Sequence, residues 1–203
     1  AGEDIHVLTA SRVLGKEKAE VQKPERQLAK ALNYGLLYGV GPAKFAASAN
    51  SDYGLHITVE EASEFREKFF EAYPALREWH HKTAQALRSG KGMKCRTLFG
   101  RVMAQGEEDY TDALNYPIQG SGADLLKLAA VKVWQDLKAF DGKARLLNLV
   151  HDEIVVAVMD PSIKAQVAVV VRDAMEEAAR KLMPQVKTPV DVEIVDAEPG
   201  LLA

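Results

Sequence analysis

Apolar residues recur with the spacing of an α-helix through the first half of the chain. The segment 24–49 carries leucines on one stripe and begins with a proline, which a first helical turn tolerates. The run Gly39-Val40-Gly41-Pro42 is expected to interrupt or end that helix. A second helix is predicted from Thr58, a good capping residue, to Pro74, and a third over about 75–87.

The pattern changes in the second half. Residues 95–103 favour a short strand pair that turns at a glycine, and a long helix is expected over about 119–140. Two β-rich runs then flank His151-Asp152-Glu153 and predict a tight hairpin whose strands are largely buried. A helix over about 162–183 and a strand over 190–195 complete the pattern. The chain is therefore predicted to be α+β, with a boundary near residue 95.

Composition sets limits on the class of protein. A chain of 203 residues can form one core or two small lobes, and its single cysteine, Cys95, cannot form a disulfide within the chain. No signal peptide and no apolar run long enough to cross a bilayer is present. We therefore expect a soluble, cytoplasmic protein with no membrane partner. The absence of an initiator methionine indicates a piece of a longer chain, although processing would leave the same start.

Charge is segregated along the chain rather than spread evenly. The formal net charge is −3, which argues against a protein coated in positive charge. Basic residues nevertheless cluster over 16–30 and 88–101, and acidic residues over 60–71 and 107–112. This segregation suits a phosphate-facing groove, although a charge run is more often an ordinary solvated face.

The hairpin tip is the first candidate for chemistry. Asp152 and Glu153 are paired carboxylates, the hard oxygen ligands that Mg²⁺ prefers, and a hairpin would hold them rigidly. The alternative is an ordinary surface turn, in which histidine, aspartate and glutamate are all common.

The second candidate is a stripe on the first helix. Arg26, Lys30, Tyr34 and Tyr38 follow at four-residue steps, so they form a gently winding row about 18 Å long, cationic at one end and aromatic at the other. A nucleoside triphosphate needs that order, with cations for its phosphates and a ring for its base or sugar. The alternative is an amphipathic helix whose tyrosines pack in a core.

The third candidate is the run from Asn115 to Asp124, which contains Pro117 and several small residues. It is expected to be a loop entering a helix. The amides of Asn115 and Gln119 could bind the acceptors that every base pair shows in the minor groove, or could serve as loop and cap groups.

Four motifs in order give the chain a resemblance to family A DNA polymerases, the DNA polymerase I family. Residues 26–39 resemble the nucleotide-binding fingers helix of that family, and Asp4-Ile5-His6 resembles the segment before it. The motifs Thr97-Leu98-Phe99-Gly100-Arg101, 115–124 and His151-Asp152-Glu153 follow in the family's order. The resemblance implies a helical fingers subdomain over 1–95 and part of an antiparallel-sheet palm with packed helices over 96–203.

The resemblance also implies roles for individual residues. Arg26 and Lys30 would hold the triphosphate of an incoming dNTP, and Lys30 would also donate a proton to the departing pyrophosphate. Tyr34 would stack on the nucleotide, and Tyr38 would lie near the template base, with Gly39 allowing close approach. The expected contacts to primer-template DNA are Thr97, Arg101, Asn115, Gln119 and His151. Asp152 would be the catalytic metal ligand of a two-Mg²⁺ site, assisted by Glu153.

One expected part is absent from this sequence. Relatives carry a further catalytic aspartate in a strand upstream of the region matching Asp4, and Asp152 with Glu153 alone makes a poor two-metal site. We therefore expect activity to need an upstream polymerase segment, in cis or in trans. A degenerate nucleic-acid-binding module is the alternative, while a metal-dependent hydrolase would need histidine ligands at a spacing that His6, His56, His80 and His81 do not show.

Overall fold

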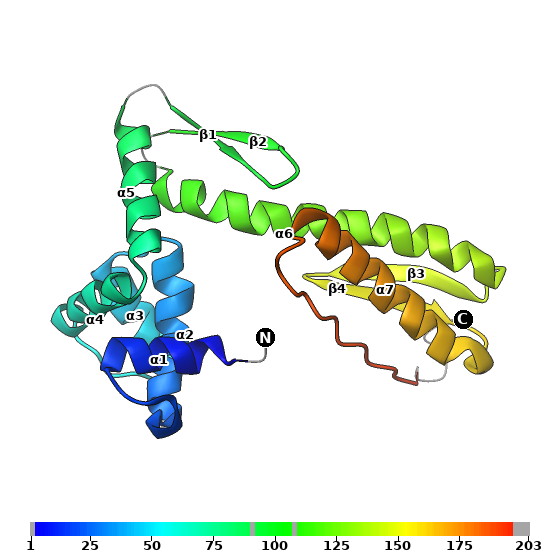
Figure 1. Ribbon diagram of the computed structural model, residues 1–203, viewed down its shortest axis with the longest axis horizontal. Coiled ribbons are helices and arrows are strands. Elements are labelled where there is room, and N and C mark those ends of the chain that lie inside the picture. The colour runs from blue at the N-terminus through cyan, green and yellow to red at the C-terminus, as the bar shows by residue number, and fades with distance from the viewer. Residues whose placement is uncertain (1–2, 90–91, 107–108, 197–203) are drawn as a thin grey trace. The chain divides into compact units, whose positions relative to one another are not determined.

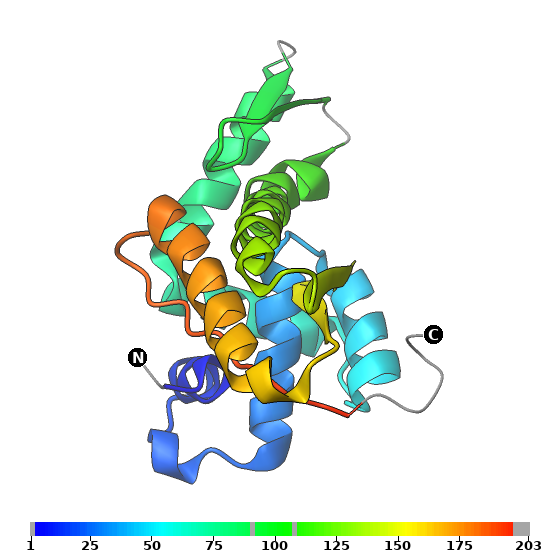
Figure 2. The same cartoon turned by 90° about the vertical axis from the view of Figure 1, so that its right-hand side faces the viewer.

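The computed structural model describes residues 3–89, 92–106 and 109–196 (Figures 1 and 2). They form two compact units, the first made of residues up to 96 with 102–117, and the second of residues 97–101 with those from 118 onward. The described residues form mostly helices, with two two-stranded antiparallel sheets. The α+β class predicted from the sequence is confirmed. No helix among these residues has the length and apolarity needed to cross a membrane.

The first unit is helical apart from one hairpin, and its predicted helices are confirmed. Thr58 caps α4 as expected, because its side chain accepts a hydrogen bond from the backbone N–H of Glu61. The elements are α1 (Ile5–Leu14), a 3₁₀ turn η1 (Lys18–Glu20), α2 (Lys23–Leu37), α3 (Pro42–Tyr53), α4 (Val59–Ala72), α5 (Pro74–Arg88), β1 (Met93–Arg96) and β2 (Val102–Gln105).

Helix α2 lies at the centre of this unit's core. Leu32 and Leu36 of α2 are almost fully buried against Phe45 of α3 and Phe69 of α4. Burying a leucine or phenylalanine side chain stabilises a fold by about 1.5–3 kcal/mol, so this cluster fixes which face of α2 points inward. The opposite face of the helix is left for polar side chains.

The C-terminal end of α2 is a Schellman motif. Gly39 has a φ of 77°, and its N–H donates to the carbonyl of Leu36, while the N–H of Val40 donates to the carbonyl of Gly35. The glycine is needed for this left-handed conformation. The predicted interruption at residues 39–42 is therefore confirmed, and α3 begins at Pro42.

Helix α6 (Tyr110–Asp136) begins nine residues earlier than the sequence indicated, so the expected loop around Asn115 is wrong. Pro117 lies inside the helix, where it removes the N–H that would bond the carbonyl of Ala113. In its place the buried thiol of Cys95 donates to that carbonyl, with the sulfur 3.5 Å from the oxygen. A donor from another element thus replaces the bond that the proline removes.

The second unit packs the end of α6 and helix α7 (Lys164–Leu182) on a hairpin. Its remaining elements are a 3₁₀ turn η2 (Leu137–Phe140), β3 (Ala144–Val150), β4 (Glu153–Val158) and a 3₁₀ turn η3 (Pro161–Ile163). Its core joins Val133 of α6, Ala144 of β3 and Val171 of α7. The tight hairpin predicted at His151-Asp152 is confirmed, with a bulge at Leu147.

Two expectations for this unit are wrong. The hairpin strands are not largely buried, because the described residues cover only one face, and Leu147, Leu149 and Val150 keep 39–55% of their surface exposed. Residues 190–195 are extended but join neither of the two sheets, so the predicted strand is absent from the described part of the chain. A strand requires a partner, and the apolar alternation of this segment alone does not supply one.

Candidate nucleotide-binding helix and carboxylate hairpin

The predicted stripe lies on the polar face of α2, with one change. Arg26, Lys30 and Tyr34 are on the helix, while Tyr38 is the residue just past its end, with φ −100° and ψ 16°. Arg26 and Lys30 are half-buried, whereas Tyr34 is 56% exposed. Tyr34 therefore does not pack in the core. This argues against the alternative interpretation of the stripe, in which its tyrosines are core residues.

Arg26 forms an ion pair with Asp4, a residue that was not among the predicted site residues. Its Nε donates to a carboxylate oxygen of Asp4 at 2.8 Å, and Asp4 also caps helix α1 through the backbone N–H groups of His6 and Val7. The hydrogen bond from Arg26 holds the pKa of Asp4 below its ordinary value. The ion pair uses Nε, so the two terminal nitrogens of Arg26 take no part in it.

A second contact from α1 orients His6 beside the stripe. The ring centroids of His6 and Tyr34 are 5.9 Å apart, and the Asn33 side-chain amide lies 3.0 Å from His6 Nδ1. Because an amide nitrogen only donates, Nδ1 accepts and the ring proton lies on Nε2. Thr9, fully buried, links this pair to Tyr73 by donating to Asn33. Partial burial lowers the pKa of His6, which favours this neutral form.

Part of the basic run over residues 16–30 is neutralised by ion pairs within the unit, including the one between Arg26 and Asp4. Lys16 pairs with Glu25, and Lys18 pairs with Glu3 at 2.6 Å. In the described residues Lys30 forms no ion pair, so its ammonium group is the uncompensated cation of the stripe. Of the second basic run, Lys94 and Arg96 are exposed, and Lys91 lies outside the described residues.

The carboxylate hairpin belongs to the second unit. His151 and Asp152 form its two-residue turn, and Glu153 opens β4 opposite Val150. His151 has a φ of 54°, a left-handed conformation that few residues other than glycine adopt and that is enriched at functional sites. All three side chains are exposed, so they can reach a ligand without any rearrangement of the core.

These residues fit only part of a metal site. Two adjacent carboxylates have the chemistry that Mg²⁺ requires. However, nowhere in the described ranges do three or more histidine, cysteine, aspartate or glutamate side chains gather as a metal-binding group. A further ligand would have to come from outside these residues.

The turn over 97–101 is fastened to α6. Leu98 N–H donates to the hydroxyl of Ser121, and Arg101 donates from Nε to Asp124 at 2.9 Å and from a terminal nitrogen to the carbonyl of Gly120. Thr97 is only 4% exposed, and its hydroxyl with Arg101 lowers the pKa of Asp124. Both residues hold the turn in this structure, and their contact with DNA stays a prediction.

Asn115 and Gln119 are both on α6 rather than in a loop. Asn115 belongs to the first unit and Gln119 to the second. Gln119 is exposed. The Oδ1 atom of Asn115 is buried and has no hydrogen-bond partner among the residues that the structure describes. A buried acceptor without a partner costs about 1–3 kcal/mol, and the contact of Asn115 with DNA stays a prediction.

Comparison with known proteins identifies the family. The sequence profile of DNA polymerase family A matches residues 1–197. The chain belongs to DNA polymerase family A. Within it, the chain is 43% identical over 194 residues to DNA polymerase I of Aquifex aeolicus, covering 96% of this chain and 33% of that protein. It is 35% identical over 213 residues to the thermostable DNA polymerase I of Thermus thermophilus, covering all of this chain and 24% of that one.

A solved structure of the family shares the fold. It is the POL domain of Pol1 from M. smegmatis in complex with DNA primer-template and dNTP, with a TM-score of 0.72 and 30% sequence identity. The match covers 87% of this chain and 31% of that domain's chain. This chain thus spans about a third or less of the relatives that it matches.

The sequence pattern indicated no role for Asp4 or His6 at this site. Both belong to the segment that resembles the family just before α2. The structure brings both beside the stripe, Asp4 against Arg26 and His6 against Tyr34.

Proposed function

We propose that this chain supplies the fingers, over residues 1–95, and part of the palm, over 96–203, of a DNA-directed DNA polymerase. It would transfer a nucleotide from a dNTP to a primer 3′-hydroxyl under the direction of a template. The observation that supports this most directly is the polar face of α2, where Arg26 and Lys30 lead to an exposed Tyr34.

The side chains of α2 have the chemistry to bind and orient a dNTP. Arg26 and Lys30 would hold the triphosphate, and Lys30 would pass a proton to the departing pyrophosphate. Tyr34 would stack on the nucleotide and Tyr38 would lie near the template base. Phosphoryl transfer depends mainly on positioning and charge neutralisation, which a rigid helix anchored in a core provides.

The hairpin would hold Mg²⁺ through Asp152, with Glu153 nearby. Two bound ions would activate the primer hydroxyl and neutralise the leaving oxygen, with a second carboxylate ligand supplied by an upstream segment. His151, Thr97, Arg101, Asn115 and Gln119 would contact the primer-template DNA. In this proposal Arg101 exchanges its Asp124 partner for a phosphate or shares itself between them.

Primer extension tests the proposal. The chain would be assayed with Mg²⁺, primer-template DNA and dNTPs, alone and with its own upstream polymerase segment. We expect synthesis only in the second case, and a loss of at least about 100-fold in kcat on Asp152→Asn. Asp141→Asn is the matched control, because Asp141 is an exposed aspartate of the same unit whose left-handed backbone suits asparagine.

Each outcome has a consequence. Robust synthesis by the chain alone would show that no upstream segment is needed. Absence of synthesis with the segment present, while DNA binding is retained, would favour the catalytically inactive nucleic-acid-binding module. Equal activity of Asp152→Asn and Asp141→Asn would show that Asp152 of the hairpin has no catalytic role.

A further inference from the structure

The last carbonyl of helix α2 has an unusual partner. The Schellman motif satisfies the carbonyls of Gly35 and Leu36. The carbonyl of Leu37 instead lies 3.0 Å from Nε2 of His80, a residue of α5 distant in sequence. The segment that ends the proposed nucleotide-binding helix is therefore held from outside the helix.

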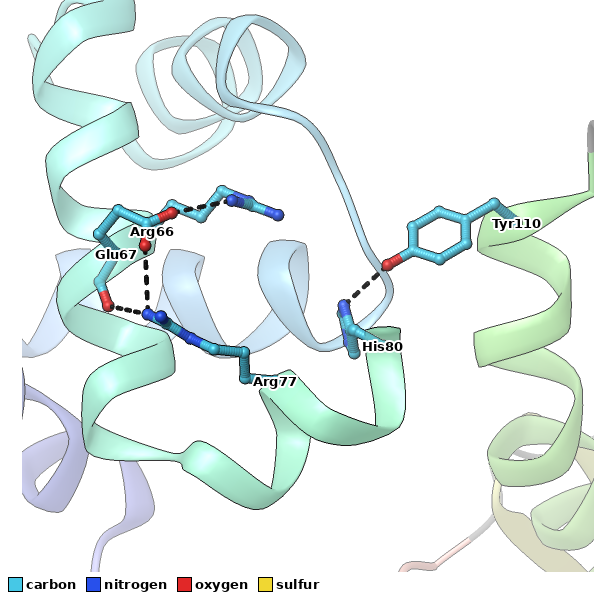
Figure 3. A network of polar contacts seen from close by, with 5 residues as sticks. All are labelled: Arg66, Glu67, Arg77, His80 and Tyr110. Carbon is cyan, nitrogen blue, oxygen red and sulfur yellow. Dashed lines mark hydrogen bonds and ion pairs between the residues drawn. The ribbon is translucent and has the colours of Figure 1, made fainter. Parts of the chain in front are cut away.

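The direction of the hydrogen bonds around His80 follows from simple chemistry. A carbonyl oxygen only accepts, so Nε2 carries the ring proton and donates to Leu37. Nδ1 then has a free lone pair and accepts from the hydroxyl of Tyr110, 3.1 Å away (Figure 3). His80 is 5% exposed, and burial lowers its pKa, which favours this neutral tautomer.

Packing supports the same arrangement. The His80 ring meets the rings of Phe70 and Trp79 edge-on, with centroids 5.0 and 5.5 Å away. The Tyr110 ring fills the space beside Gly39, where an added Cβ would come within 2.7 Å of Cε1. Tyr110 thus touches the helix end directly and also through His80.

The charged groups near His80 are paired or face the rings. Arg66 of α4 and Arg77 of α5 both bind Glu67 at 3.1 Å (Figure 3). Both guanidinium groups also lie over the Phe70 ring. Arg66 opposes protonation of His80. Both arginines donate hydrogen bonds to Glu67, so neither competes with His80 for Leu37 or Tyr110.

We propose that His80 and Tyr110 are positioning residues that lock the C-terminal end of α2, and that this lock sharpens the choice of the incoming nucleotide. The inference rests on the proposed function of α2. The lock acts on Leu37, next to Tyr38 and one helical turn from Tyr34, the two rings proposed to meet the nascent base pair. A looser helix end would place these rings less well against a correct pair, whereas an incorrect pair, which does not fit them, would lose little.

The first test measures the lock itself, without any activity. Amide hydrogen exchange at Gly39 and Val40 would be compared in the 203-residue chain and its variants. We expect Tyr110→Phe and His80→Leu to speed exchange by roughly threefold to tenfold, as the loss of one hydrogen bond implies. His80→Gln keeps an amide donor for Leu37 and is expected to fall between wild type and His80→Leu. His81→Gln, on the exposed face of α5, is the control.

The second test measures nucleotide selection by the chain assembled with its upstream segment. We expect Tyr110→Phe to lower kcat/KM for the correct dNTP roughly threefold to tenfold and to leave incorrect insertion nearly unchanged. A purely structural defect reduces the active fraction and scales both values alike. Unchanged selectivity in both Tyr110→Phe and His80→Leu, or unchanged exchange at Gly39, would overturn the proposal. An inactive wild-type assembly would instead refute the proposed function, and the exchange data would still decide whether the lock exists.

Discussion

The thiol of Cys95 donates a hydrogen bond to the carbonyl of Ala113, the group that Pro117 leaves without its helical donor. The sulfur is buried, and burial raises the pKa of the thiol, so the donor proton is retained well above neutral pH. The single cysteine of the chain thus has a structural role tied to a proline 22 residues later.

A double-mutant cycle tests this coupling. We expect Cys95→Ala to lower the free energy of unfolding by about 1–2 kcal/mol, from lost packing and an unpaired carbonyl. In a Pro117→Ala background the cost should be smaller, because the N–H of residue 117 can then bond to Ala113. Denaturant unfolding of the four proteins gives the interaction energy, and additive losses would contradict the proposed coupling.

The packing at Gly39 predicts a large cost for any side chain. Gly39→Ala must adopt a left-handed backbone and place a methyl group within 2.8 Å of Tyr110 and Leu114. We expect a loss of about 2–4 kcal/mol in stability. Gly54→Ala is the control, since Gly54 has a φ of 64° but no atom within 4 Å of the added Cβ. Equal losses in the two variants would show that crowding by Tyr110 adds nothing.

Burial of His80 predicts a pH-dependent stability. Its pKa in the folded chain lies below the ordinary 6.5, so below that pH the unfolded chain binds more protons than the folded one. Stability from this group is therefore complete above about pH 6.5 and is lost as the pH falls through the lowered pKa. His6 shifts in the same direction, so the comparison to make is wild type against His80→Gln, whose difference in unfolding free energy should shrink from pH 7.5 to pH 5. A difference that stays constant would count against a neutral buried His80.

The hydroxyl of Tyr34 predicts how the assembled polymerase treats dideoxynucleotides. The resemblance to family A polymerases implies that a tyrosine at this position favours their acceptance, because its hydroxyl can stand in for the missing 3′ oxygen. We expect Tyr34→Phe to reduce dideoxynucleotide incorporation relative to dNTPs by roughly tenfold, the effect of losing one strong hydrogen bond. Tyr38→Phe is the control and should leave the ratio unchanged. An unaltered ratio in Tyr34→Phe would show that this hydroxyl has no such role.

Local patterns were enough to predict most elements. The capping residue Thr58, the break at Gly39 and the tight turn at His151 are each set by residues close in sequence. The stripe on α2 could be found for the same reason, since helical spacing alone puts Arg26, Lys30 and Tyr34 on one face.

Features that depend on distant partners could not be predicted. The start of α6 was missed because Pro117 signals a helix end, and the compensating donor is on another element. Burial of the hairpin strands was overestimated because apolar composition does not reveal how many faces are covered. The site contacts of Asp4 and His6, and the role of His80, likewise come from pairs that are 20 or more residues apart.

The extended segment over residues 190–195 has a consequence for handling the chain in solution. Val192, Ile194 and Val195 expose 42–71% of their surfaces on a backbone outside both sheets of the described chain. Such a segment is a template for β-pairing between molecules. Purified samples should therefore self-associate as concentration rises, and lysine substitutions at positions 192 and 194 are the changes most suited to keeping them monodisperse.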